Sequence, residues 1–494
     1  MARRITLAVA HGPVTPRHRY AAELCFETIC GFELVDVVTA QEAAGREGEV
    51  GWYGGEFEFE SEIESEIESE VEVESESESE SESEVEIESE VEIEIEIESE
   101  IGVGDGDGVE GGVEVEDEIE VEIGVGIAGG VEVVGGGGRR VWMEACGLLS
   151  GRERTAVPPE RDVLAFAFFC ATRMEEAVEG APRDAMGRFQ GADSAAARGG
   201  WLERPEVELR MRAWARSWGW EVESREFRLV PTVDVDSALA FRGKGWLRTG
   251  AACARELVRG RVGEAVRRAA VAAGRGEDPF DTYEELERLH AEAGLRARYF
   301  FLLADRGPHD RGMDWRRPAL REVVRRVAKT AEVGIHPGVR AHDAADAAVA
   351  IARERERLEE VLGVKVEHAR FHYLLQRPPA TWRACVEAGI RYDHSMGFAD
   401  RVGFRTGCAR PIRAYDLDKE APLDLWLHPV VAMDATLRRY MGLAPAEAVE
   451  RVRALAAEAR AVGGEVELLW HNESSSGEAG WAGWREVFGG MVGV

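Results

Sequence analysis

The sequence predicts an α/β fold in which helices surround a parallel sheet or barrel. Three observations support this fold class. Short apolar segments alternate with helical patterns from about residue 228 onward, and repeated βα units build parallel sheets. Two aspartates, Asp234 and Asp236, end the first of these segments, and histidines follow several later ones. In parallel α/β folds the reactive groups collect at the carboxyl ends of the strands.

The expected elements follow one another along the second half of the chain. After the first strand, a long helical pattern covers 249–273. The next helix begins at Thr282, where Thr282 and Glu285 form a capping-box pattern, and it stops at Gly294. The remaining expected strands are 299–303, 333–335, 366–371, 389–392, 423–427 and 465–470, and the remaining expected helices are 319–329, 344–362 and 445–461.

An acidic low-complexity segment interrupts the first half of the chain. Every even position from Glu56 to Glu100 is Glu, and 55–138 holds 33 acidic residues and no basic one. The period of two could form a β-ladder with an all-Glu face, but opposed like charges destabilise a sheet. A block without countercharge also cannot offset its ordering entropy. We predict a disordered Glu/Gly-rich insert without a catalytic role; loose binding of divalent cations or of a basic partner is the alternative.

The predicted domains are placed around this insert. Residues 1–54 and 139–225 form a smaller α/β N-terminal domain of unknown role, 55–138 is the insert, and 226–494 is the catalytic domain. Without the insert the chain carries 61 acidic and 60 basic residues, so we expect no nucleic-acid partner. The sequence does not indicate an oligomeric state.

The compartment is predicted from the cysteines and from the apolar runs. Seven dispersed cysteines without a Cys-x-x-Cys pair fit reduced thiols in a cytoplasmic protein. The apolar run at the N-terminus is short for a signal peptide. No run approaches the roughly 18 apolar residues of a membrane span, so none is expected.

Two aspartates and four histidines are the candidates for chemistry. Asp234 and Asp236 share one face of a strand, where they could serve one reaction centre; a solvated turn is the alternative. Each of four histidines follows an expected strand, and this repetition favours a metal or proton-transfer site over four separate structural roles. These histidines are His336, His372, His428 and His471.

Four motifs carry a family resemblance. Residues 232–236 (TVDVD), 334–337 (GIHP), 370–373 (RFHY) and 468–472 (LLWHN) resemble, in this order, the motifs of the polysaccharide deacetylase (NodB-type carbohydrate esterase) superfamily. The similarity covers about 228–490. It is greatest to a bacterial subgroup with an extra N-terminal domain. The stretches 168–176, 187–189 and 200–205 resemble that domain, and the stretches 278–282 and 393–397 resemble the subgroup's catalytic part.

The resemblance implies a distorted (β/α) barrel of about seven units and metal-dependent hydrolysis of an N-acetyl group. It makes Asp234 the general base, Asp236 and His336 metal ligands, Arg370 the residue that orients the base, and His471 the general acid. This chemistry is coherent, because a divalent metal activates water and polarises an amide carbonyl. A positioned base and acid then move the protons.

The chain departs from the family in its second motif. The family has a second histidine four residues after the first, where this sequence has Arg340. We predict that His372 supplies the missing third ligand, with His342 as the alternative. Three protein ligands and an open position suit Zn²⁺, although other first-row metals accept the same donors.

Two acidic residues have more than one possible role. Asp434 could orient His471 or His428, or it could cap a helix at 435–440. Glu473 is an alternative proton carrier beside His471.

The sequence therefore predicts a cytoplasmic, zinc-dependent carbohydrate deacetylase, an amide hydrolase acting on C–N bonds of an N-acetylated sugar or glycan precursor. One alternative keeps the fold and changes the substrate to a non-sugar C–N bond, as in relatives that resemble allantoin-ring hydrolases. The other is a non-catalytic glycan-binding module in which the changed second motif reflects lost metal affinity.

Overall fold

The computed structural model describes residues 4–9, 14–39, 50–53, 84–87, 93–96, 131–134, 138–143, 148–149 and 151–493, except 218, 223–224, 343–344 and 479. The chain divides into two compact units, 1–54 with 132–494, and 55–131. In the smaller unit, strands β4 (Glu84–Ile87) and β5 (Ile93–Glu96) pair antiparallel, with Glu opposite Glu in the register. The predicted disordered insert falls mostly outside the described residues and stays a prediction.

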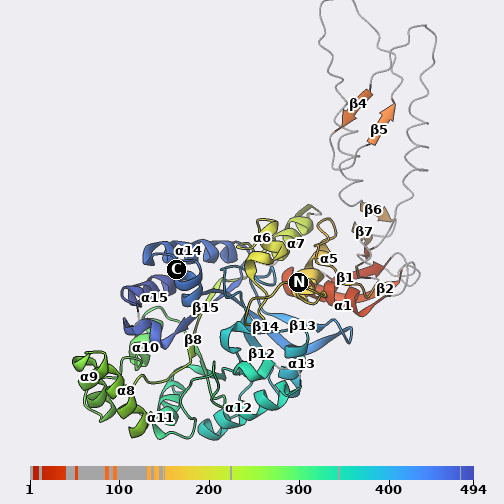
Figure 1. Ribbon diagram of the computed structural model, residues 1–494. Helices are drawn as coiled ribbons and strands as arrows, with labels where there is room; N and C mark the ends of the chain where they lie inside the picture. Colours follow the sequence, from red (N-terminus) through yellow and green to blue (C-terminus); the bar gives the residue numbers. More distant parts are fainter. Residues whose placement is uncertain are drawn as a thin grey trace, which may run out of the picture. The chain divides into compact units, whose positions relative to one another are not determined.

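A closed barrel of seven parallel strands lies at the centre of the larger unit, with helices around it (Figure 1). Pairing of the first and last strands closes the barrel. The order around the barrel is β12 (Tyr392–Met396), β11 (His368–Ala369), β10 (Glu332–Ile335), β9 (Arg298–Phe301), β8 (Arg228–Val235), β15 (Glu465–His471) and β14 (Ala421–Met433). An eighth strand, β13 (Ile412–Asp416), pairs antiparallel with β14. The predicted fold class is confirmed.

Helix α11 (Pro318–Val327) packs an apolar stripe against the barrel. Its buried residues are Leu320, Val323, Val324 and Val327, which is the spacing of one helix face. The other helices around the barrel are α8 (Trp246–Val258), α9 (Val262–Ala272), α10 (Tyr283–Glu292), α12 (Ala347–Leu362), α13 (Ala380–Glu387), α14 (Pro445–Ala461) and α15 (Trp484–Val492). No helix in the described part of the chain has the length and apolar character to cross a membrane.

Three local predictions are wrong. The pattern over 249–273 forms two helices, α8 and α9, because the chain turns at Gly260, which has a φ of 72°. Thr282 makes no capping bond; its hydroxyl donates to the Asn472 carbonyl oxygen instead. Strand β14 continues beyond Leu427, so His428 lies inside a strand rather than after one.

The N-terminal region of the larger unit contains a second, five-stranded sheet and several helices. The strand order is β2-β1-β3-β7-β6, with bounds Glu33–Thr39, Arg4–Val9, Val50–Tyr53, Gly138–Met143 and Val131–Val134. The helices are α1 (Pro16–Ala22), the π-helix η1 (Glu23–Ile29), α5 (Val163–Ala171), α6 (Ala195–Arg198) and α7 (Glu206–Ser217).

This region shares one hydrophobic core with the barrel. Phe168 of α5 contacts Tyr415 of β13, with ring centroids 5.1 Å apart. Buried ion pairs add to the contact, because Arg17 lies 2.7 Å from Glu420, and Arg405 lies 2.6 Å from Glu176. Removing one partner of such a buried pair leaves an uncompensated charge. The boundary predicted at residue 225 remains a prediction.

Candidate metal centre

Strand register brings the predicted site residues to one end of the barrel. Asp234 of β8 pairs with His471 of β15 on one side and with Phe300 of β9 on the other. On the next strand, His336 follows directly after β10. Because parallel strands end together, the side chains beyond these positions meet at the carboxyl end of the barrel.

Asp236, His336 and His372 form a group that we call the mouth cluster. Their candidate ligand atoms all lie within 4.8 Å of one another. Asp236 Oδ1 is 3.3 Å from His336 Nε2, and Asp236 Oδ2 is 3.4 Å from His372 Nε2. Nitrogen and oxygen ligands of a tetrahedral zinc stand about 3.3 Å apart, as follows from bonds of about 2.0–2.1 Å. The spacing of the mouth cluster therefore fits a metal ion.

Hydrogen bonds orient both histidines of the mouth cluster. His336 Nδ1 donates to the Arg370 carbonyl oxygen at 2.6 Å, and His372 Nδ1 donates to Asp310 Oδ1 at 3.0 Å. Each bond leaves Nε2 as the atom that faces the cluster. Buried His336 Nε2 and Asp236 Oδ1 have no hydrogen-bond partner within the described residues. Unsatisfied buried polar atoms are costly, and a metal would satisfy both of them.

The charges within the mouth cluster also favour a cation. Burial alone would raise the pKa of Asp236, but His372 and His336 hold it well below its usual range. Burial would lower the pKa of His372, but Asp236 and Asp310 raise it to about 9. Asp236 is partly exposed, whereas both histidines are buried, so the cluster has an open side for water or substrate.

The turn after β11 directs His372 into the mouth cluster. The 3₁₀ turn η5 (His372–Leu374) has positive φ angles at Tyr373 and Leu374, 62° and 53°. Such angles are unfavourable for residues other than glycine and persist where surrounding contacts hold them. The Tyr373 ring stacks on His372 with ring centroids 4.0 Å apart, which fixes the imidazole further.

Arg340 and His342, the other two residues considered at the second motif, lie outside the mouth cluster. The Arg340 side chain is 73% exposed and lies 3.9 Å from Asp346. His342 Nδ1 donates to the Val339 carbonyl oxygen, and His342 is not among the clustered ligands. Of the two alternatives for the third position, the structure brings His372 to Asp236 and His336.

Asp234 and Arg370 form a buried pair beside the mouth cluster. Arg370 Nη1 lies 3.3 Å from Asp234 Oδ1, and the second oxygen of Asp234 lies 3.8 Å from His336 Nε2. Arg370 is fully buried, and its Nε donates to the His394 carbonyl oxygen at 2.7 Å. The guanidinium therefore fixes the orientation of the Asp234 carboxylate. The role of Asp234 as a general base stays a prediction.

His471 and Asp434 form a second buried pair at the same end of the barrel. His471 Nδ1 donates to Asp434 Oδ1 at 2.7 Å, and the His471 backbone N–H donates to Asp434 Oδ2. Burial alone would lower the pKa of His471, but Asp434 raises it to about 10. Asp434 also accepts from the Ala435 N–H, but the π-helix at Thr436–Tyr440 has no side-chain cap, so the structure shows Asp434 orienting His471 and not capping this helix. The nearby Glu473 carboxyl has a pKa raised by burial.

A different group, the interior cluster, fills the middle of the barrel with His394, His428 and Glu467. His394 Nδ1 lies 2.9 Å from Glu467 Oε1, and His428 Nδ1 lies 3.4 Å from the same oxygen. Arg370 Nη2 and Arg298 Nη1 reach Glu467 at 2.9 and 3.2 Å. The expectation that His428 joins the other histidines at a strand end is wrong, since its position inside β14 places it in this network.

Some residues that complete the site were not predicted. Asp310 lies in the loop after β9, where no strand or helix pattern marks it. Glu467 could have been found from the sequence. A carboxylate between Val466 and Leu468 in a buried strand indicates an inward-facing charge.

The fold and these contacts define a parallel α/β barrel whose mouth carries three candidate metal ligands, a carboxylate held by arginine and a histidine held by aspartate. The N-terminal half is similar to a family described only as a family of unknown function (DUF7033), which matches residues 7–217. No curated protein matches the chain.

Among solved structures, the chain is similar to one titled "Crystal structure of putative polysaccharide deacetylase from Mycobacterium smegmatis". The two share 19% identity, with 55% of this chain and 85% of that chain covered and a TM-score of 0.36. A similarity at this level does not define the chemistry, which rests on the side chains described above.

Proposed function

We propose that this protein is a metal-dependent amide hydrolase that removes the N-acetyl group from a sugar or glycan precursor. One observation carries the proposal: the mouth cluster of Asp236, His336 and His372 lies at the same end of the barrel as two oriented pairs, one for each proton that must move. A purely structural network would be expected to satisfy His336 Nε2 and Asp236 Oδ1 with hydrogen bonds, which both atoms lack within the described residues.

The mouth cluster would hold the metal, and zinc fits its two nitrogens and one carboxylate best. When bound, a divalent metal supplies Lewis-acid chemistry by polarising a carbonyl and lowering the pKa of water. Asp234 accepts a proton from the attacking water, because Arg370 keeps its carboxylate in position and leaves one oxygen toward His336.

His471 supplies the proton that the leaving nitrogen requires. Expelling an amine anion is unfavourable, so amide cleavage depends on a general acid. Asp434 keeps His471 protonated at neutral pH. Because Nδ1 is bonded to Asp434, the other ring nitrogen, Nε2, is the one that can donate the proton. The resemblance of the four motifs to sugar deacetylases supports an N-acetylated sugar as the substrate.

A cytoplasmic location belongs to the same proposal. Six cysteines in the described part of the chain are free thiols, and five of them are buried. Free thiols are typical of a reducing compartment.

Metal content and acetate release test the proposal together. The full-length protein should bind about one zinc per chain and release acetate from at least one member of a panel of N-acetylated sugars. Asp236→Ala should lose both properties, whereas the matched control His342→Ala should keep both, because His342 lies outside the mouth cluster.

Other outcomes separate the alternatives. If the protein binds zinc but hydrolyses only non-sugar amides, the proposed substrate class is wrong and the proposed metal-dependent amide hydrolysis stands. Glycan binding by a protein that takes up no metal would contradict the proposed enzyme and indicate a binding module.

A further inference from the structure

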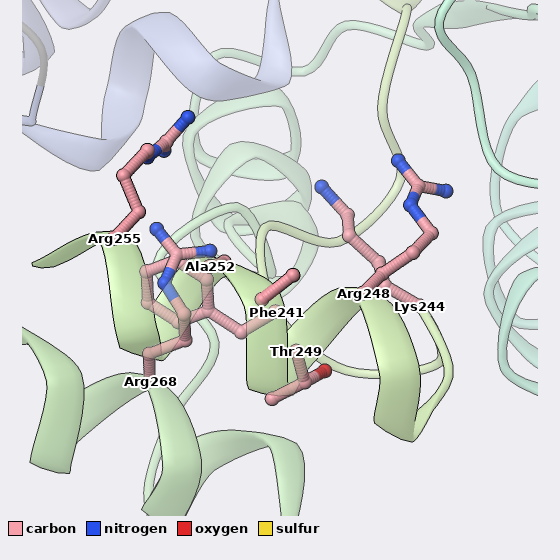
Figure 2. Close-up of a pocket in the computed structure, with 8 residues that line it drawn as sticks. Phe241, Lys244, Arg248, Thr249, Ala252, Arg255 and Arg268 are labelled. Atoms are coloured by element: carbon pink, nitrogen blue, oxygen red, sulfur yellow. The ribbon is translucent and has the colours of Figure 1, made fainter.

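A basic cavity of about 420 Å³ lies beside α8, close to the point where β8 ends (Figure 2). Its floor is apolar and includes Phe241 and Ala252. Its polar lining comes from Lys244, Arg248, Thr249, Arg255 and Arg268, and it contains no acidic residue. Figure 2 shows the charged ends of the lysine and the three arginines directed to the same side of the cavity.

Most of these cations lack a direct ion-pair partner among the described residues, although the charges of Asp278 and Glu473 act to raise the pKa of Lys244. Within the described residues, Lys244, Arg248 and Arg268 make no ion pair, whereas Arg255 lies 3.4 Å from Glu256. The Arg268 guanidinium lies 4.3 Å from the centre of the Phe241 ring, and its buried Nε has no hydrogen-bond partner. Burial and the neighbouring Arg248 lower the pKa of Lys244 to about 8. The cavity therefore holds an excess of positive charge that an anion would relieve.

A well-anchored loop connects the cavity to the mouth cluster. Residues 237–245 run from Asp236 to α8. The Asp278 carboxylate accepts the backbone N–H groups of Ala240, Phe241 and Arg242, which fixes the middle of this loop. Asn472, next to His471, donates to the Ser237 carbonyl oxygen at 3.2 Å. These bonds anchor the loop that links the cavity to Asp236 and join its first residue to the residue after His471.

We propose that this cavity binds a phosphate or diphosphate group of the same substrate whose N-acetyl group reacts at the mouth cluster. This inference rests on the proposed function and narrows it to phosphorylated N-acetyl sugars. Three unpaired cations exceed what one carboxylate neutralises, but they match the two or more charges of a phosphate ester or a diphosphate. Arginine forks and the Thr249 hydroxyl are suited to phosphate oxygens.

The same phosphate chemistry could come from a soluble sugar phosphate or from a lipid-linked one. Apolar side chains are exposed on the helices that form the cavity: Trp246, Leu247 and Val258 of α8 are 81%, 67% and 88% exposed, and Val262 and Val266 of α9 are 57% and 62% exposed. Exposed apolar side chains beside arginines are typical of helices that lie on a membrane surface. The experiments therefore test a soluble phosphate compound and a lipid-linked phosphate separately.

Binding is measured first, by calorimetric titration of the full-length protein with inorganic pyrophosphate in the presence of a chelator. The chelator removes any contribution from a metal. The double variant Lys244→Gln/Arg248→Gln should bind at least tenfold more weakly than wild type. The charge-matched control Arg288→Gln/Arg453→Gln, which alters two exposed residues elsewhere, should bind as wild type does. Lys244→Arg/Arg248→Lys keeps both charges and should retain binding. Equal affinity in wild type and the Gln/Gln variant would overturn the proposal.

Asp236→Ala separates this inference from the proposed function. It should bind pyrophosphate as wild type does, because Asp236 does not line the cavity. Acetate release should be at least tenfold faster, in kcat/KM, from N-acetylglucosamine 1-phosphate than from N-acetylglucosamine, and Lys244→Gln/Arg248→Gln should abolish that preference. Equal rates for the two sugars would contradict the inference and leave the amide hydrolase intact.

Vesicles distinguish the two sources of phosphate. Vesicles of phosphatidylcholine with one fifth phosphatidylglycerol should bind wild type more than the Lys244→Gln/Arg248→Gln variant if a lipid carries the group. Pyrophosphate binding without vesicle binding would support the same site with a soluble substrate.

Discussion

The mouth cluster and the interior cluster contain the same kinds of residue and differ in how these residues are satisfied. Each combines two histidines with one carboxylate whose ligand atoms lie within 4.8 Å of one another. In the interior cluster, Glu467 is contacted by two arginines and both histidines. In the mouth cluster, His336 Nε2 and Asp236 Oδ1 lie 3.3 Å apart but have no hydrogen-bond partner within the described residues.

The difference shows that residue types and spacing alone do not identify a metal site. Arginine already supplies the positive charge in the interior cluster, so a metal there would have to displace a guanidinium. At the mouth, hydrogen bonds to Nδ1 orient both histidines, and within the described residues only these two histidines form ion pairs with Asp236. We therefore expect substitutions at the mouth to change chemistry and those in the interior to change stability.

The largest effect is expected for the histidine that donates the proton. His471→Gln should lower kcat by about 10²–10⁴-fold, the range for loss of a general acid, while zinc content stays unchanged. Steady-state acetate release and metal analysis measure the two quantities. His428→Gln is the matched control in the interior cluster, and a similar loss of kcat there would contradict the separation of roles.

Glu467→Gln should lower the free energy of unfolding by about 3–5 kcal/mol, because it removes a carboxylate that pairs with the fully buried Arg370 and the partly buried Arg298. Urea denaturation of the metal-free protein measures this change. Asp236→Asn in the same assay should have a much smaller effect. If Asp236→Asn were the more destabilising of the two, the comparison between the clusters would be wrong.

Asp310, the hydrogen-bond partner of His372 Nδ1, should have a moderate effect on metal affinity. Asp310→Asn should weaken zinc binding by about 10–100-fold, as is typical when the partner of a ligating histidine is changed. His372→Ala should weaken it further, whereas His342→Ala should leave it unchanged. Competition with a zinc chelator measures all three affinities, and a stronger effect of His342→Ala would transfer the ligand role to that residue.

The last prediction concerns the pH dependence of stability. Asp434 raises the pKa of His471 to about 10 in the folded protein, above its usual value of 6.5. The charged pair therefore contributes fully below pH 6.5 and is lost as pH rises through about 10. One proton limits this slope to about 1.4 kcal/mol per pH unit. Stability of metal-free His471→Gln should vary less than wild type between pH 6.5 and 10, and parallel curves would exclude this contribution.

Much of this comparison was accessible from the sequence. Alternating strand and helix patterns predicted the barrel, and the residue that follows a parallel strand has a predictable place, so Asp236, His336 and His471 were assigned to one end. His372 was predicted because Arg340 left the second motif incomplete.

The remainder depends on information that is not local. His428 was misplaced because Pro429 does not end β14, and only pairing with β12 and β15 extends that strand to Met433. Asp310 reaches His372 across 62 residues, and no local pattern encodes that contact. The capping box at Thr282 failed because a tertiary acceptor, the Asn472 carbonyl oxygen, competes for the hydroxyl.

Arg370 has a consequence for how the protein folds. Its guanidinium contacts Thr232 and Asp234 of β8, Glu467 of β15 and the backbone of β12, so one side chain joins strands that are widely separated in the chain. Contacts between such distant segments form late, after the entropy of closing long loops has been overcome. The carboxylate of Asp234 is therefore oriented only in the closed barrel, and a nascent chain released before β15 is synthesised would have the ligand residues without an assembled site.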